Sequence, residues 1–404
     1  MDWPLIRLDE LYDIARGGSP RPIKKFLTND ANGVNWIKIG DATASEKYIY
    51  ETKEKIIPEG INRSRFVNKG DFLLSNSMSF GRPYIMGTTG CIHDGWLVLS
   101  PKDELIDQDF LYYLLGSPFV FQQFDSLAAG STVRNLNIDL VSSVKIPLLP
   151  LEEQKRIVAI LDQAFADIDK ARALTEQNLK NARELFESYL QKVFSQRGEG
   201  WVEKTLGDAV VVERGSSPRP IKKFQTGSED GVNWVKIGDA KEGQKYINKT
   251  KEKITREGAT KSRFVDIGDF ILSNSMSFGR PYIMAIQGYI HDGWFVLRLP
   301  EDIDSNYFYY LLSSPYLKSQ FHHLAAGAIV KNISGDLVKK AILPLPSIDK
   351  QKEIALKLDL ISREIDLLED LYHRKATQVD ELKKSILQKA FSGELTKDSK
   401  EAAA

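Results

Sequence analysis

The sequence predicts an α+β protein with two similar α/β domains, each of which is followed by one long helix. Two observations lead to this prediction. An internal repeat covers nearly the whole chain of 404 residues. In addition, two long segments contain neither glycine nor proline, and their apolar residues recur every three or four positions, as in coiled-coil helices.

The repeat is clearest in the twelve residues SNSMSFGRPYIM, which occupy positions 75–86 and return at 273–284. The motifs SPRPIKKF, KIGDA and HDGW also occur twice, each at the same offset of 198 positions (75 against 273). A deletion of one residue reduces the offset to 197 at the LAAG motif, which begins at 127 and at 324. Because this period far exceeds that of solenoid repeats, the chain is a duplicated pair of modules.

Each copy divides into a mixed domain and a helix. The runs VNWIKI, DFLLS and CIHDGWLVL have the composition of strands, with glycine, asparagine and aspartate as boundaries. The segment DQDFLYYLLGSPFVFQQFDSL, residues 107–127, is predicted to be helical. We expect a first domain at 1–150, a helix at 151–197, a second domain at 198–347, a helix at 348–393, and a flexible tail at 394–404 whose last letters, EAAA, could derive from cloning.

Both long segments predict a coiled-coil seam with alternating steps of four and three residues. Because the second domain follows the first helix after only a few residues, the second helix can pair with the first only by running antiparallel. We therefore expect two domains that are held apart by an antiparallel coiled coil and related by an approximate two-fold axis. The predicted seam includes Ile157, Leu161, Ile168, Leu185, Ile354, Leu358, Ile361, Ile365, Leu382 and Ile386.

Charge and cysteine content exclude several classes of protein. The 55 basic and 55 acidic residues give a formal net charge of zero. Basic residues nevertheless gather in motifs such as SPRPIKKF and INRSRF, so the neutral total can hide a basic face. The single cysteine, Cys91, excludes a disulfide framework and a cysteine-rich zinc site. The chain start lacks a signal-peptide pattern and no apolar run is long enough to span a membrane, so we expect a cytoplasmic protein.

Two near-identical modules related by a two-fold axis suit double-stranded DNA, because an interrupted palindrome presents one half-site to each module. Arginine and lysine suit phosphates and guanine edges, asparagine suits adenine, and serine can serve either base. We expect most of the basic residues to contact phosphate, which positions the protein without specifying a sequence. The candidate DNA-binding residues of the first copy are Ser19, Arg21, Lys24, Lys25, Lys38, Arg63, Arg65, Asn76, Ser77, Ser79, Arg82, Arg134 and Asn135. Those of the second copy are Ser217, Arg219, Lys222, Lys223, Lys236, Lys261, Arg263, Asn274, Ser275, Ser277, Arg280, Lys331 and Asn332.

Two other classes of function remain open from these residues alone. Each copy contains a histidine–aspartate pair, His93 with Asp94 and His291 with Asp292, which could form a duplicated enzyme site together with a serine. The same HDGW motif also fits a turn before a strand, without any chemistry. The third class is a duplicated coiled-coil scaffold that binds only proteins, in which case the RPIKK motif is a solvated surface.

The sequence resembles the specificity (S) subunit of type I restriction–modification systems. The GGSPR motif looks like the start of a target recognition domain of that family, and NWIKIGD and KGDFLLSNSMSFG resemble the strands that follow. The segments IPLLPLEEQKRIVAILD and LPLPSIDKQKEIALKLD match the two occurrences of the family's conserved helical region. The chain departs from the family in one respect, because its two recognition domains are close copies.

This resemblance implies a non-catalytic chain that holds two methyltransferase (modification) subunits on a bipartite DNA site and, with restriction subunits, licenses ATP-driven cleavage. S-adenosylmethionine would bind to the methyltransferase, and ATP and Mg would serve restriction. The sequence contains neither a G-x-x-x-x-G-K-S/T loop nor an Asn-Pro-Pro-Tyr or Asp-Pro-Pro-Tyr motif. We expect Phe165, Phe186 and Phe194, which lie outside the predicted seam, to remain available to partner helices. The close similarity of the copies predicts a target that is an interrupted palindrome or close to one.

Overall fold

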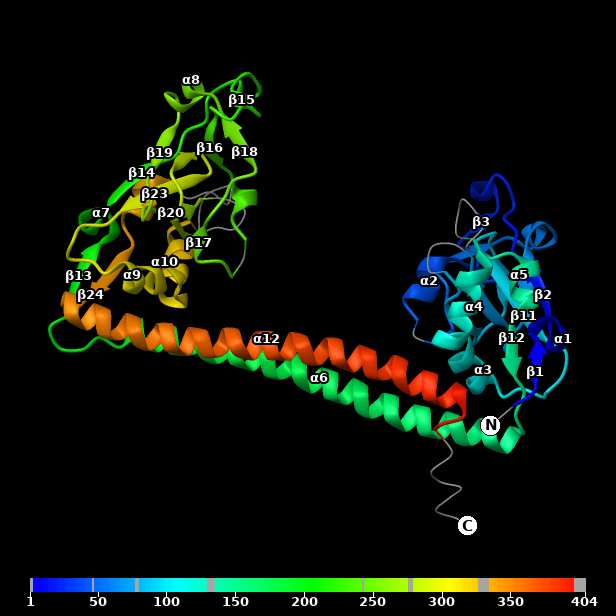
Figure 1. Ribbon diagram of the computed structural model, residues 1–404. Helices are drawn as coiled ribbons and strands as arrows, with labels where there is room; N and C mark the ends of the chain where they lie inside the picture. Colours follow the sequence, from blue (N-terminus) through cyan, green and yellow to red (C-terminus); the bar gives the residue numbers. More distant parts are fainter. Residues whose placement is uncertain are drawn as a thin grey trace, which may run out of the picture. The chain divides into compact units, whose positions relative to one another are not determined.

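The computed structural model describes residues 3–45, 47–76, 80–128, 135–241, 243–274, 279–325 and 334–395. The chain divides into two compact units (Figure 1). The first unit comprises residues 1–175 and 374–404, and the second comprises residues 176–373. Within the described ranges, no helix is both long enough and apolar enough to cross a membrane.

One sheet forms the centre of the first unit. Its five strands have the order β2-β11-β8-β9-β5, and only β5 runs parallel to its neighbour. The side chains of β8 and β9 are buried throughout, and because successive side chains point to opposite faces, both faces of this sheet are covered. In the order of the sheet, the strands are Tyr12–Arg16, Trp96–Pro101, Phe72–Ser75, Pro83–Met86 and Tyr48–Ile49.

A second five-stranded sheet packs on the first. Its order is β3-β6-β4-β10-β7, with β4 and β10 parallel and the other neighbours antiparallel. A buried cluster with side chains from both sheets joins them, and Trp96 Nε1 donates to the main-chain oxygen of Ile37 at 3.3 Å. In the order of the sheet, the strands are Leu27–Thr28, Glu54–Ile56, Val34–Ile37, Gly90–Ile92 and Arg65–Val67.

Helices cover the outer face of the central sheet. The segment predicted to be helical at 107–127 forms two helices, α3 (Gln108–Leu115) and α4 (Pro118–Ala128). The chain breaks there because proline can begin a helix but cannot continue one. The remaining short elements of the unit are β1 (Leu5–Arg7), α1 (Leu8–Leu11), η1 (Ile23–Lys25), α2 (Ile39–Thr43), η2 (Pro58–Arg63), α5 (Ile138–Ser143) and β12 (Lys145–Pro147).

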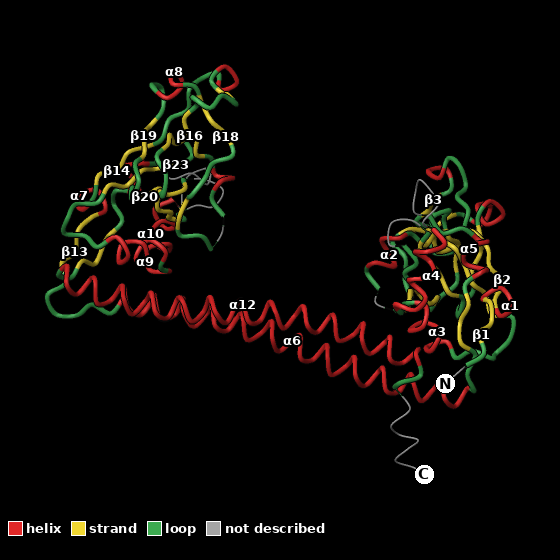
Figure 2. The backbone as a smooth tube through the Cα atoms, in the orientation of Figure 1, coloured by secondary structure: helices red, strands yellow, loops and turns green. Residues whose placement is uncertain are grey.

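The second unit repeats this arrangement (Figure 2). Its sheets have the orders β14-β23-β20-β21-β17 and β15-β18-β16-β22-β19, again with one parallel pair in each. The strands are Val202–Thr205 (β13), Val211–Arg214 (β14), Gln225–Thr226 (β15), Val232–Val235 (β16), Tyr246–Ile247 (β17), Glu252–Ile254 (β18), Arg263–Val265 (β19), Phe270–Ser273 (β20), Pro281–Met284 (β21), Gly288–Ile290 (β22), Trp294–Arg298 (β23) and Ile342–Leu345 (β24). The helices are Leu206–Ala209 (α7), Ile221–Lys223 (η3), Ile237–Asp239 (η4), Arg256–Ala259 (α8), Ser305–Ser313 (α9), Pro315–Ala325 (α10) and Gly335–Val338 (α11).

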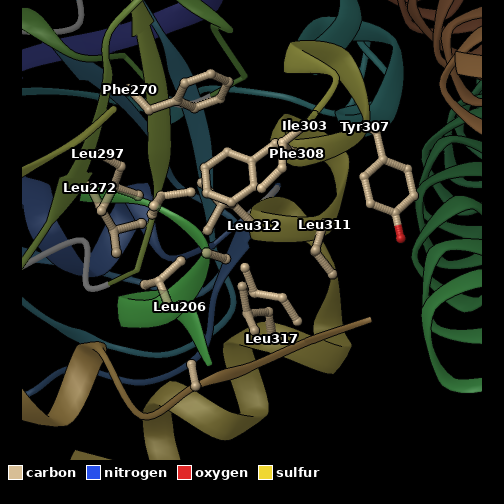
Figure 3. Packing of buried hydrophobic residues seen from close by; sticks show 14 of the residues in the cluster. Leu206, Phe270, Leu272, Leu297, Ile303, Tyr307, Phe308, Leu311, Leu312 and Leu317 are labelled. Carbon is tan, nitrogen blue, oxygen red and sulfur yellow. The ribbon is translucent and has the colours of Figure 1, made fainter. Parts of the chain in front are cut away.

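Aromatic rings fill the space between the central sheet and the helices of the second unit (Figure 3). The rings of Phe270 on β20 and Phe308 on α9 meet edge to face, with centroids 5.1 Å apart. Leu206, Leu311 and Leu317 complete this fully buried cluster. Edge-to-face contacts of this kind add about 0.5–1.5 kcal/mol to the free energy of burial.

Two helices of 45 residues each, α6 (Leu151–Ser195) and α12 (Ile348–Ser392), contribute to both units. In the first unit, Lys383 contacts Asp169 at 2.5 Å and Arg172 contacts Asp380 at 3.5 Å. In the second unit, α6 and α12 are joined by an ion pair at 2.5 Å between Arg183 and Glu369. In the first unit the residue number rises along α6 from 169 to 172 while that of its partner falls along α12 from 383 to 380, so the antiparallel pairing is confirmed there.

The seam differs from its prediction toward the second half of α6. Ile157 and Leu161 are fully buried, as is Leu358 on α12. Leu185 is 73% exposed and Leu382 is 48% exposed, so the seam prediction is wrong at these two positions. The half-buried residues after Thr175 are instead Leu179, Ala182, Phe186, Tyr189 and Val193. These positions still alternate in steps of four and three, but Phe186 takes the place predicted for Leu185, because this part of α6 also packs on the buried cluster of the second unit.

The three phenylalanines expected to face partner subunits belong to the protein's own cores. Phe194 is fully buried, and its ring lies 5.5 Å from that of Tyr307. Phe186 packs on the same cluster, and Phe165 packs on the corresponding cluster of the first unit. The prediction that they remain available is wrong because the helices pack on the units as well as on each other.

Candidate nucleic-acid interface

A pocket of about 1070 Å³ opens on the β3-β6-β4-β10-β7 side of the first unit. The turn after β2 forms one wall, with Arg21 and Pro22 joined by a cis peptide bond. The strands β3, β4 and β6 form another wall, and the turn between β10 and β11 closes the pocket. The lining residues are Ser19, Pro20, Arg21, Pro22, Ile23, Lys24, Leu27, Trp36, Lys38, Glu54, His93 and Asp94.

The turn after β2 is fixed against the HDGW turn. Gly17 and Gly18 donate main-chain hydrogen bonds to the oxygens of Trp96 at 2.9 Å and Ile92 at 3.1 Å. A Cβ atom at Gly17 would lie 2.0 Å from the main-chain oxygen of His93, so only glycine permits this approach. The glycine motif therefore places the following Ser19 and Arg21 at the pocket.

Asp94 has polar partners at both its side chain and its main chain. Ser19 Oγ donates to Asp94 Oδ1 at 2.5 Å, and Arg21 Nη2 lies 3.6 Å from Asp94 Oδ2. Its main-chain oxygen accepts from Asn76 Nδ2 at 2.9 Å and from Arg16 Nε at 3.2 Å. The hydrogen bond from Ser19 is the largest cause of the lowered pKa of Asp94, so the carboxylate is a fixed negative charge at neutral pH.

The opposite side of the pocket carries an ion pair. Lys38 Nζ donates to Glu54 Oε1 at 2.6 Å, with both side chains about two-fifths exposed. The Lys38 main chain donates to Asp41 Oδ2 at 2.9 Å, which holds the lysine at the end of β4. Trp36 is buried on β4, directly opposite Glu54 on β6. The pocket thus combines apolar walls with charged groups at its rim.

The histidine does not form a catalytic triad with its neighbours. His93 Nδ1 accepts a hydrogen bond from the main chain of Gly95 at 2.8 Å, and burial lowers the pKa of His93. Ser19 donates to the carboxylate of Asp94, whereas a triad requires serine bonded to histidine and histidine bonded to aspartate. The main-chain N–H of Trp96 donates to the main-chain oxygen of His93 at 3.1 Å, so the interpretation of HDGW as a turn is confirmed.

The second unit has the corresponding pocket, with a volume of about 820 Å³. Ser217 Oγ donates to Asp292 Oδ1 at 2.6 Å, and Asn274 Nδ2 donates to the Asp292 main-chain oxygen at 2.8 Å. Lys236 Nζ donates to Glu252 Oε1 at 2.6 Å. The lining residues are Ser217, Pro218, Arg219, Pro220, Ile221, Lys222, Gln225, Trp234, Lys236, Glu252, His291 and Asp292.

Comparison with known proteins places both repeats in one family. A family model described as the type I restriction modification DNA specificity domain matches residues 1–178 and 198–374. The chain belongs to this family. Each match contains one complete pocket, so the pocket is part of the specificity domain.

Relatives of this specificity protein align along almost all of its length. It is 24% identical over 420 residues to the MjaVIII specificity subunit of Methanocaldococcus jannaschii, with 98% of this chain and 93% of the relative covered. It is 23% identical over 423 residues to the EcoBI specificity subunit of Escherichia coli, with 98% and 86% covered.

Two solved structures show the same fold. One, from work on complex assembly and conformational transition of the type I R-M system, gives a TM-score of 0.75 at 21% identity and covers 97% of this chain and 98% of that one. The HsdS subunit from Thermoanaerobacter tengcongensis gives 0.61 at 22% identity and covers 97% of both chains. The predicted class of two mixed domains with two long helices is therefore confirmed.

The basic residues predicted in the specificity protein lie mainly at the pocket or beside it. Arg21 and Lys24 line the pocket, and Lys25 is exposed next to them on η1. The guanidinium of Arg63 lies over the ring of Phe26, with 5.5 Å to the centroid. In the second unit, Lys261 takes this position over Phe224, at 4.4 Å.

Other predicted residues lie elsewhere or have another role. Arg65 is exposed on β7, whereas its counterpart Arg263 pairs with Glu213 at 3.0 Å. The guanidinium of Arg82 lies 5.2 Å from the ring centroid of Tyr84, and Asn135 is half-buried. Arg280 is half-buried. Seven predicted residues lie outside the described ranges: Ser77, Ser79, Arg134, Ser275, Ser277, Lys331 and Asn332.

Two of the predicted base contacts are wrong. Asn76 and Asn274 are only 2% exposed, and their amides are bonded to the main chain of the HDGW turn. The sequence shows that an amide side chain follows the strand, but it does not show whether that side chain points into the protein or toward solvent. Both side chains therefore hold the pocket together and cannot reach a base edge.

Sequence reasoning missed the acidic and aromatic part of the pocket. Glu54 and Glu252 were not among the candidates, nor were Trp36, Trp234 and the pair of positions 27 and 225. A signal was present, since the motif TKEKI occurs at 52 and 250 with the glutamate in the same place. The described residues contain no group of three or more histidine, cysteine or acidic side chains that could hold a metal ion.

Proposed function

We propose that this specificity protein binds a bipartite DNA site, with one half-site at the pocket of each unit. The supporting observation is the recurrence of the same pocket, with the same basic rim, in both copies of the repeat. Arg21, Lys24 and Lys25 in the first unit correspond to Arg219, Lys222 and Lys223 in the second. Exposed basic side chains of this kind bind the phosphate backbone, and groups in the pocket bind base edges.

The half-sites are proposed to be nearly the same sequence in opposite orientation. Pockets with almost the same lining present almost the same hydrogen-bonding groups to DNA. The target is then an interrupted palindrome or close to one.

The chain is further proposed to place two methyltransferase subunits, together with restriction subunits, on this DNA. The long helices retain apolar surface for such partners after packing on their own units. Leu185 on α6 is 73% exposed, and Leu356, Leu360 and Leu367 on α12 are 54–67% exposed. Side chains of this type, exposed on a helix, are characteristic of protein interfaces when they form a patch.

The chain itself is proposed to be non-catalytic. In both units the serine hydroxyl donates to the aspartate, so the histidine is not placed to accept its proton. S-adenosylmethionine is assigned to the methyltransferase, and ATP and Mg to the restriction subunits.

Methylation mapping at single-base resolution tests this function. DNA from cells that express the chain with its methyltransferase subunit should carry methyl groups at one bipartite, nearly palindromic site, and cells without the chain should lack them. Two unrelated half-sites would contradict the symmetric target. Methyl transfer or cleavage by the purified chain alone would instead favour the duplicated enzyme, and failure to bind any duplex at low salt would favour the protein scaffold.

A further inference from the structure

The two pockets differ at one lining position. Of the twelve residues that line each pocket, eleven are the same in type, and the twelfth is Leu27 in the first unit and Gln225 in the second. Position 27 lies on β3 and position 225 on β15, at the start of each edge strand. An exchange of leucine for glutamine replaces an apolar group by a hydrogen-bond donor and acceptor.

Strand pairing brings this position next to the pocket glutamate. Leu27 lies opposite Ile56 on β6, and Gln225 lies opposite Ile254 on β18. Glu54 and Glu252 lie two residues before Ile56 and Ile254 on these strands. Each glutamate therefore projects from the same face of the sheet as the residue at 27 or 225 and is its diagonal neighbour. The residue at 27 or 225 is therefore placed to change what the glutamate offers to a ligand.

In the second unit, both oxygens of this glutamate are engaged. Lys236 Nζ donates to Glu252 Oε1 at 2.6 Å, and Gln225 Nε2 donates to Glu252 Oε2 at 2.6 Å. These two hydrogen bonds are the main causes of the lowered pKa of Glu252. The amide of Gln225 keeps its oxygen and its second N–H for a ligand.

In the first unit, the corresponding oxygen is open. Lys38 Nζ donates to Glu54 Oε1 at 2.6 Å, but leucine at position 27 has no donor for Oε2. Among the described residues, no other side chain donates to Glu54 Oε2. An ionised carboxylate oxygen at a pocket wall accepts hydrogen bonds and repels acceptors, so it selects ligands with an amino group.

We infer that positions 27 and 225 determine one base pair in each half-site, and that the two half-sites differ at that base pair. This inference rests on the proposed function. In the first unit, Glu54 Oε2 accepts from the N4 amino group of cytosine, as glutamate does in DNA recognition. In the second unit, Gln225 offers the donor and acceptor pair that matches N7 and the N6 amino group of adenine. The otherwise near-palindromic target thus carries one asymmetric position.

Reciprocal substitution tests this inference without introducing a foreign residue into either pocket. Leu27→Gln, Gln225→Leu and the double exchange each place a side chain where the other repeat already accommodates it. Each variant is expressed with the methyltransferase subunit, and the methylated site is mapped at single-base resolution. Asn62→Thr is the matched control, because it also converts an exposed residue of the first repeat into its counterpart, Thr260, but lies outside the pocket.

The expected result is a defined change at one position. Leu27→Gln should make the half-sites alike with adenine at that position, and Gln225→Leu should make them alike with cytosine. The double exchange should restore the wild-type site, because swapping the halves of an otherwise palindromic target gives the same duplex read from the other strand. Affinity for the original duplex should fall about 5- to 150-fold with either single substitution. Asn62→Thr should leave the map unchanged. A methylated site that is the same in the wild type and both single pocket variants overturns the inference while leaving the proposed function intact. If the wild-type complex methylates no specific site, the proposed function itself is overturned.

Discussion

Asn76 donates from its buried amide to the main-chain oxygen of Asp94 at 2.9 Å, and Asn274 makes the same bond to Asp292 at 2.8 Å. The main chain of each asparagine is also fixed, because Asn76 N donates to Gly95 O and Asn274 N donates to Gly293 O. Each asparagine therefore joins the end of a core strand to the turn that carries the pocket aspartate.

Replacing Asn76 with alanine should destabilise the protein by about 1–3 kcal/mol, because a buried polar group loses its partner. Chemical denaturation measures this loss. Asn76→Asp keeps the shape but removes the donor, so it should cost at least as much. An unchanged free energy of unfolding together with altered sequence preference would restore Asn76 as a base-reading residue.

Replacing Lys24 or Lys25 with alanine should weaken binding to every duplex, whatever its sequence. Each lost phosphate contact should reduce the slope of log affinity against log salt by about one. Binding titrations at several salt concentrations provide the measurement. Lys170→Ala removes the same charge from an exposed position on α6 and serves as the control. A slope that stays constant would show that η1 does not contact phosphate.

Arg82→Ala should act differently, by relaxing the choice of base at one half-site. The cost against the cognate base pair should be about 1–3 kcal/mol, because the guanidinium is expected to bind a base edge. Competition between cognate and singly changed duplexes measures it. Equal weakening on all duplexes would place Arg82 among the phosphate contacts instead.

The protein should lose stability as the pH falls below 6.5. Burial lowers the pKa of His93 and His291 in the folded protein, whereas the unfolded chain titrates near the ordinary value of 6.5. Between the folded and unfolded pKa values the unfolded state binds more protons, so acid favours unfolding. Replacing both histidines with glutamine should flatten the dependence of unfolding free energy on pH below about 7. An equally steep dependence in the double variant would assign it to other groups.

A half-chain of residues 1–197 should form a dimer. In the first unit, the end of α12 supplies Phe391, whose ring lies 5.4 Å from that of Phe110. Phe194 occupies the corresponding place on α6 and packs on Tyr307 of the second unit. A second copy of the half-chain can therefore supply its own Phe194 to Phe110. Sedimentation at several concentrations should show twice the monomer mass, and Phe194→Ala should weaken the dimer by about 3–5 kcal/mol for each of its two buried rings. A folded monomer at micromolar concentration would contradict this prediction.

Much of the architecture could be predicted because it depends on sequence-local signals. The repeat gave two equivalent domains, and Pro150 and Pro346 marked the starts of helices at Leu151 and Ile348. The prediction of the seam failed at Leu185 because burial there depends on how α6 packs on the second unit. Heptad spacing carries no information about that packing.

The pocket was predictable only in part, because its residues meet through strand pairing. The basic motif around Arg21 and Lys24 is continuous in sequence and was recognised. Glu54 meets Lys38 from a separate strand and lies beside Leu27 only through the register of β3 and β6. The inward orientation of Asn76 depends on the turn to which its amide is bonded, and that turn cannot be read from the residue type. The residue type alone suggested a DNA contact.

The division of the chain into units also sets an order of folding during synthesis. The second unit is one continuous segment, residues 176–373, whereas the first needs residues 374–404 as well. Phe391 and Ala390 are part of the first unit's buried core, so that core stays incomplete until the chain has almost ended. At about 5–20 residues per second, ribosomes need roughly 10–40 s to proceed from residue 175 to Phe391. The domain that is synthesised first is thus the last to be completed, and its exposed apolar surface must be tolerated or chaperoned throughout that interval.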